Sequence, residues 1–199
     1  GGGPALGNQG IWLGNNNEVA VVGVDGTLFL IDDKWVKISD GELKTESILY
    51  AVWGTSSTDI FAVGGDDYPR VGAVFHFDGS EWMKMEIPSE NELRGVWGTA
   101  SDNVYAVGEK GTALHYDGEK WSEMEIGTTD SLSDVWGSGK DNVYVAGGNT
   151  VLRYNGDKRD TVLSDEKYNF IGVHGNSADN IAVIGRSIDS EIKKPVIFH

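Results

Sequence analysis

The sequence predicts an all-β fold built from five similar sheets, and three observations support this prediction. A Val-Trp-Gly sequence begins at Val52, Val96 and Val135, and each copy is followed by short apolar segments. Glycine supplies 28 of 199 positions, about twice its usual share of ~7%, and this frequency indicates many turns. No segment carries the i, i+3, i+4, i+7 spacing of apolar residues that an amphipathic helix requires.

The repeated tryptophan defines the period. Trp12, Trp53, Trp97 and Trp136 are followed by His174 at the equivalent position, with steps of 41, 44, 39 and 38 residues. These steps bracket the ~40–45 residues of a propeller blade. We therefore expect five copies, covering about residues 9–48, 49–92, 93–131, 132–169 and 170–199 of a single domain 1–199.

Each complete copy contains four predicted strands. In the third copy they cover 93–97, 104–108, 112–116 and 121–126. The turn pairs Asp102-Asn103 and Asp117-Gly118 separate them, and Asp-Gly is a strong hairpin signal. Each copy is therefore a four-stranded antiparallel meander.

The apolar patterns predict how the sheets pack. The second strands, such as 60–63, are apolar on both faces and must be covered on both sides. The fourth strand alternates, and we expect Met83 and Met85 to face the core while Trp82 faces solvent. Radially arranged sheets meet both requirements, so the fold class is a five-bladed β-propeller.

The fifth copy lacks a fourth strand. Its third strand falls near residues 195–199. We expect either that the amino-terminal segment around Pro4-Ala5-Leu6 completes the last blade, or that this blade keeps an open edge.

The repeat as it stands at 96–121, Val-Trp-Gly then Asp-Asn-Val-Tyr-Ala-Val-Gly then His-Tyr-Asp-Gly and Trp, resembles the repeats of bacterial β-propeller proteins. Proteins of this kind are commonly secreted or lipid-anchored. The resemblance implies an extracellular or cell-envelope location and a binding role, and it supplies no functional residues. The chain lacks the Ser-x-Asp-x-Gly-x-Thr-Trp box of sialidases and the Trp-Asp dipeptide of the eukaryotic repeats.

The charge restricts the partners. With 31 acidic and 16 basic side chains the net charge is −15. Such a surface repels nucleic acid, because binding starts with cationic side chains that neutralise phosphate. No apolar stretch approaches the ~18 residues of a membrane span, so no membrane insertion is expected. We expect a monomer that binds a protein or a glycan.

Most repeated residues have a structural explanation. The inner tryptophans are expected to pack between blades, and the outer ones, Trp35, Trp82 and Trp121, to be partly exposed. Repeated Asp residues in turns cap backbone N–H groups. His76, His115 and His199 occupy one repeat position and are expected to pack rather than bind metal. We expect no catalytic residue, no metal and no cofactor.

Departures from the repeat are better candidates for function. The loops at 65–72 and 186–194 are longer than their counterparts, and both emerge on one face of a propeller. Tolerated growth of surface loops is the alternative explanation. The candidate ligand-binding residues are Asp66, Asp67, Tyr68, Arg70, Ser187, Asp189 and Glu191.

Tyr68 and Arg70 are the expected anchors, since aromatic and Arg side chains dominate contact energies. The alternative function is glycoside hydrolysis, with Asp66, Asp67, Asp189 or Glu191 as acid and base. The inner strands carry almost no carboxylate, Asp134 being the nearest exception, which weighs against catalysis. A third alternative is a lectin with equivalent sites between blades.

Overall fold

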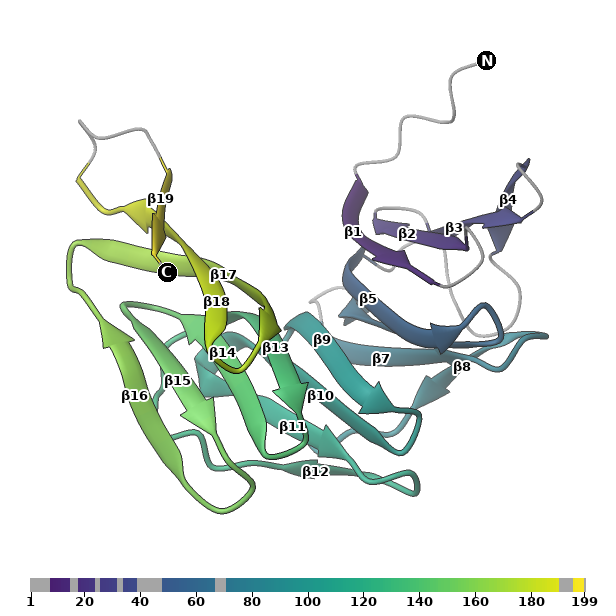
Figure 1. Cartoon of the computed structure of the whole chain (residues 1–199). Helices are drawn as coiled ribbons and strands as arrows, with labels where there is room; N and C mark the ends of the chain where they lie inside the picture. The colour runs from purple at the N-terminus through teal and green to yellow at the C-terminus, as the bar shows by residue number, and fades with distance from the viewer. Residues whose placement is uncertain are drawn as a thin grey trace.

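The computed structural model describes residues 8–14, 18–23, 26–31, 34–38, 48–66, 71–189 and 195–198. Their strands form five antiparallel sheets, which follow one another in an arc in Figure 1. Four sheets have four strands, and the last has three. The predicted all-β class and the four-stranded antiparallel sheets are confirmed.

The strands follow the chain from the inner to the outer edge of each sheet. The first sheet is β1 (Asn8–Leu13), β2 (Val19–Gly23), β3 (Gly26–Ile31) and β4 (Lys34–Ile38). The second is β5 (Ile48–Ser56), β6 (Asp59–Asp66), β7 (Val71–Phe77) and β8 (Trp82–Met85). The third is β9 (Leu93–Ala100), β10 (Asn103–Gly108), β11 (Ala113–Tyr116) and β12 (Trp121–Glu123).

The remaining two sheets continue this order. The fourth is β13 (Leu132–Gly139), β14 (Asn142–Gly147), β15 (Thr150–Tyr154) and β16 (Arg159–Ser164). The fifth is β17 (Tyr168–Ser177), β18 (Asn180–Ser187) and β19 (Pro195–Phe198). The inner strands β1, β5, β9, β13 and β17 contact one another in this order. The described residues include no helix long and apolar enough to cross a bilayer.

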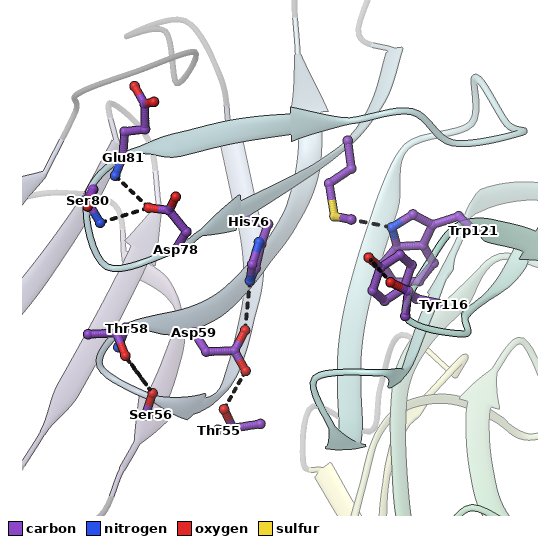
Figure 2. A network of polar contacts seen from close by, with 12 residues as sticks. Thr55, Ser56, Thr58, Asp59, His76, Asp78, Ser80, Glu81, Tyr116 and Trp121 are labelled. Carbon is purple, nitrogen blue, oxygen red and sulfur yellow. Dashed lines mark hydrogen bonds and ion pairs between the residues drawn. The ribbon is translucent and has the colours of Figure 1, made fainter.

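The hairpin between the third and fourth strands is held by its turn residue. Asp78 Oδ1 accepts the N–H groups of Ser80 at 2.8 Å and Glu81 at 3.1 Å (Figure 2). Gly79 has a φ of 94°, a conformation that glycine adopts without strain. These hydrogen bonds lower the pKa of Asp78. Asp117 and Asn155 make the same contacts in the next two sheets, so these turns act as predicted.

An interlock of tryptophan and glycine joins neighbouring sheets. The indole of one inner strand lies over the Val-Trp-Gly or Val-His-Gly glycine of the next, so closely that a Cβ added there would fall within 2.8 Å of the ring. The pairs are Trp53 with Gly98, Trp97 with Gly137, and Trp136 with Gly175. Trp12 also packs on the core between the first two sheets. The predicted packing of the inner tryptophans between blades is confirmed.

The outer tryptophans differ from the prediction. Trp82 is 0% exposed and Trp121 is 5% exposed, whereas Met83 is 41% exposed. The expected exposure of Trp82 and Trp121 was wrong, because each indole fills the space between the outer parts of two sheets. The side chain of Trp35 lies outside the described residues.

The repeated histidines pack against aromatic residues of their own sheets. His76 Nε2 lies 2.7 Å from Asp59 Oδ1 (Figure 2). The His76 ring lies against Phe61 with a centroid distance of 4.4 Å. His115 makes the matching contact with Asn103, also at 2.7 Å. Burial lowers the pKa of His115. The prediction of packing is confirmed for these two residues, and His199 lies outside the described part of the chain.

The fifth sheet has only three strands among the described residues. This agrees with the sequence prediction, which places no fourth strand in the fifth copy. The segment around Pro4-Ala5-Leu6 lies outside the described residues, so both alternatives, completion of the sheet by this segment and an open edge, stay predictions.

Candidate functional site

The structure describes only part of the predicted loop site. Asp66 ends β6 and pairs with Val71. Ser187 ends β18, and its Oγ accepts the N–H of Asp189 at 3.1 Å. Among the predicted site residues that the structure describes, only Ser187 and Asp189 are in contact, and they are two positions apart in the sequence. The rest fall outside the described residues: Asp67, Tyr68, Arg70 and Glu191.

A β-bulge interrupts each inner strand at the same place. The pairing register with the second strand shifts by one residue, three positions before the repeated Trp or His. A bulge leaves one residue unpaired and redirects its side chain. We call this set the bulge ring: Gln9, Tyr50, Arg94, Ser133 and Ile171.

The bulge ring differs from the rest of the repeat because no two of its side chains are alike. Four of them, Gln9, Tyr50, Arg94 and Ser133, line a central cavity of about 570 Å³. Three tryptophans of the interlock, together with Asp134 and His174, contribute to the same wall. The cavity therefore combines aromatic surface with charged and polar groups, a composition typical of ligand sites.

Arg94 is the cationic centre of the bulge ring. Its Nη2 donates to Glu109 Oε1 at 2.7 Å and to Glu92 Oε2 at 3.3 Å. The hydroxyl of Tyr50 donates to the other oxygen of Glu92 at 3.0 Å. The guanidinium carbon also lies 5.4 Å from the centre of the Tyr50 ring. The hydrogen bond to Glu109 is the main reason why the pKa of Arg94 is raised.

These contacts hold the Arg94 side chain in place before any ligand arrives, which lowers the entropic cost of binding. They come from three elements: Tyr50 from β5, Glu92 from the loop before β9, and Glu109 from the short 3₁₀ turn at Glu109–Gly111. The cluster carries two carboxylates for one guanidinium, so its formal charge is negative.

Asp134 follows the bulge of β13. The other copies have Gly10, Ala51, Gly95 and Gly172 at this position. A carboxylate here is therefore a local departure from the repeat.

The Asp134 carboxylate joins two sheets. Oδ1 accepts the N–H of Val135 at 2.9 Å, and Oδ2 accepts the N–H of Val173 in β17 at 3.0 Å. Loss of water around the half-buried group raises its pKa to about 6, despite the opposing effect of both hydrogen bonds and of His174.

Sequence reasoning noted Asp134 as an exception but missed Tyr50 and Arg94. One signal could have found them. The position three residues before each repeated Trp or His differs in every copy, while the residue directly before that Trp or His is Val or Ile in all five. Variation at one register of a repeat marks side chains that the fold itself does not require.

Comparisons with known proteins find similarity in structure alone. No family model matches the chain, and no curated protein matches it. The crystal structure of the RRP9 WD40 repeats aligns with 98% of this chain at a TM-score of 0.74 and 7% identity. The chain covers 63% of that protein.

A second similar structure is the extracellular domain of a putative one-component system, BT4673, from B. thetaiotaomicron. It aligns with 100% of this chain at a TM-score of 0.69 and 10% identity. The chain spans 31% of that domain. Similarity at sequence identities this low supports a shared fold and nothing further. The chain therefore has a β-propeller fold made of four-stranded antiparallel sheets.

Proposed function

We propose that this protein is a non-catalytic binding module of five blades, which holds a protein or glycan ligand at the bulge ring. The observation that carries the proposal is the set of five bulges in register, each with a different side chain, four of which line one cavity. A repeat protein needs no such variety for packing, because equivalent positions have equivalent neighbours.

The position of the bulge ring agrees with the loop face predicted from the sequence. Ile48 and Leu49, directly before Tyr50, pair with Gly65 and Gly64. The bulge of the second blade therefore lies beside the first residue of the predicted loop at 65–72. We keep Tyr68 and Arg70, which lie outside the described residues, as additional predicted contacts.

The chemistry of the bulge ring suits a ligand with many hydroxyl or amide groups. Arg94 and the ring of Tyr50 offer a donor and an aromatic surface, and residues of these types carry most of the energy of protein interfaces. Glu92 and Glu109 accept the hydrogen bonds that hold Tyr50 and Arg94 in place. The excess of carboxylates disfavours anionic ligands such as nucleic acid.

A non-catalytic role agrees with the state of Asp134. A glycoside hydrolase needs a free acid and a free base about 5–10 Å apart. Both oxygens of Asp134 already accept backbone N–H groups, which is the arrangement of a structural carboxylate. We also propose an extracellular or cell-envelope location, which is supported by the repeat pattern and by the extracellular domain among the similar structures.

A glycan array tests the proposal with three proteins: the wild type, Arg94→Gln, and the double variant Tyr68→Ala with Arg70→Ala. We expect a glycan that the wild type binds to lose most of its signal with Arg94→Gln. Retention by Arg94→Gln together with loss in the double variant would move the site to the loops. If no protein binds any glycan, a protein partner becomes the favoured ligand.

A further inference from the structure

The tryptophans of the interlock also form part of the central cavity. Trp53, Trp97 and Trp136 all belong to its lining, and Trp53 and Trp97 are half-buried rather than fully enclosed. They come from β5, β9 and β13, and each of these strands contacts the inner strands of the sheets on both of its sides. The aromatic part of the cavity wall therefore does not depend on the first or the last sheet.

Each of these indoles is covered on one face by its own sheet. Trp97 pairs with Tyr105 of β10, and their ring centres lie 6.1 Å apart with 25° between the planes. Trp136 and Tyr144 of β14 repeat this arrangement at 6.2 Å and 29°. The second strand lies outside the inner strand, so the opposite face of each indole is the one that the central cavity reaches.

Hydrogen-bonding groups of the bulge ring lie beside this aromatic surface. Arg94 precedes Trp97 by three residues on β9, Ser133 precedes Trp136 by three on β13, and both line the cavity. The ion pairs of Arg94 use Nη2, which leaves the N–H groups of Nε and Nη1 for a ligand. The wall thus combines flat apolar surface with polar groups along one side of it.

The size and charge of the cavity favour a small neutral group. Its volume of about 570 Å³ lies within the ~300–1,000 Å³ of sites for small ligands. Besides His174, the charged side chains of the lining are one cation and one carboxylate, Arg94 and Asp134. A ligand therefore needs no net charge to match this wall.

We propose that the central cavity binds a neutral saccharide, one pyranose ring of which stacks on the inner face of Trp97. The C–H groups on the face of a pyranose are apolar and slightly positive, which suits the electron-rich face of an indole. The hydroxyl groups at the edge of the sugar accept from Arg94 and exchange hydrogen bonds with Ser133. Three residues of a strand cover about 10 Å, a length that a disaccharide spans. This inference rests on the proposed function and narrows its ligand to one class.

Saturation-transfer NMR tests the inference with the full chain and three neutral disaccharides: cellobiose, lactose and N,N′-diacetylchitobiose. We expect at least one of them to bind, with most of the saturation on the C–H protons of one pyranose ring. Sorbitol, which has hydroxyl groups but no ring, should receive none. Trp97→Phe reduces the stacking surface and is expected to weaken binding at least threefold. Trp121→Phe makes the same change at an indole packed between the outer parts of two sheets and should leave binding unchanged.

The same variants separate this inference from the proposed function. Loss of binding with Arg94→Gln but not with Trp97→Phe would overturn the stacking and keep the bulge ring as the site. Binding that survives both changes would place the saccharide elsewhere and contradict both proposals.

Two further results would overturn the saccharide assignment. If none of the three disaccharides binds, the ligand of the bulge ring is a protein. Equal signals from sorbitol and the disaccharides, or equal effects of Trp97→Phe and Trp121→Phe, would show that no pyranose stacks in the cavity. Circular dichroism of each variant establishes that the fold is retained, and the pattern of saturated sugar protons needs no variant.

Discussion

Each inner strand has two levels that contrast sharply. At the level of the interlock three successive junctions pair a tryptophan with a glycine, and the contacts are nearly the same at each. Three residues earlier, in the bulge ring, every blade carries a different side chain. The comparison teaches that in this protein the repeated level builds the fold, while the varied level is available for recognition.

The largest expected effect is at the repeated level. Trp97 contacts the cores of two junctions, so Trp97→Ala removes apolar contacts from both. We expect a loss of about 3–5 kcal/mol in the free energy of unfolding. Urea unfolding measures it, with the exposed Met83→Ala as a control that should change by less than about 0.5 kcal/mol. A loss below about 1 kcal/mol for Trp97→Ala would contradict the role of the interlock.

The next effect concerns Asp134, which joins the fourth and fifth sheets. Its folded-state pKa is raised from 3.8 to about 6, so the folded protein holds this proton more tightly than the unfolded chain does. Its contribution to stability is therefore largest below about pH 4 and declines as the pH rises to about 6. The raised pKa corresponds to roughly 2–3 kcal/mol.

The side chain that Asp134→Asn introduces cannot ionise, so this variant tests how the free energy of unfolding depends on the ionisation of Asp134. We expect the stability of the variant relative to the wild type to rise by roughly 2–3 kcal/mol between pH 4 and pH 7. Urea unfolding of both proteins at the two pH values gives this difference and cancels the titration of other groups. A difference that stays constant, or falls with pH, would show that the pKa of Asp134 is not raised.

A smaller effect is expected when the glycine of the interlock acquires a side chain. The Cβ of Gly137→Ala would lie 2.6 Å from the Trp97 ring and 2.8 Å from the Asn142 carbonyl oxygen. We expect a loss of about 1–3 kcal/mol, because the indole must move. Gly139→Ala is the matched control on the same strand, since no described atom lies within 4 Å of its Cβ. Equal thermal unfolding temperatures for the two variants would contradict the interlock.

The smallest effect on stability is expected in the bulge ring. The Arg94 side chain is 37% exposed, and ion pairs at such exposure contribute little. Arg94→Gln keeps a donor for Glu92 or Glu109, and we expect it to lower the free energy of unfolding by less than about 1 kcal/mol. Urea unfolding checks this value, and a loss above 3 kcal/mol would make Arg94 a structural residue.

The sequence predicts the features that recur, because each copy repeats the same physical requirement. Asp78 and Asp117 hold their hairpins as predicted, and Trp136 packs between blades. Trp82 was assigned to solvent from strict alternation with Met83. The burial of its indole depends on the neighbouring blade, which no pattern within one strand records.

The candidate site was harder to predict. A bulge depends on pairing between strands, so the sequence around Tyr50 or Arg94 contains no local signal for it. The proximity of Tyr50, Glu92 and Glu109 also depends on neighbouring elements of the fold. Asp134 was noticed only because it is a carboxylate in an apolar inner strand.

The division between the two levels is tested most directly by one comparison of equilibrium unfolding in urea. The first protein carries Gln9→Ala, Tyr50→Phe, Arg94→Lys and Ser133→Ala, which together change four side chains of the bulge ring. The second carries Trp97→Ala alone. We predict that the fourfold variant stays within about 1–2 kcal/mol of the wild type, while the single variant loses about 3–5 kcal/mol. A fourfold variant less stable than Trp97→Ala would show that the bulge ring serves the fold, and would contradict its assignment to recognition.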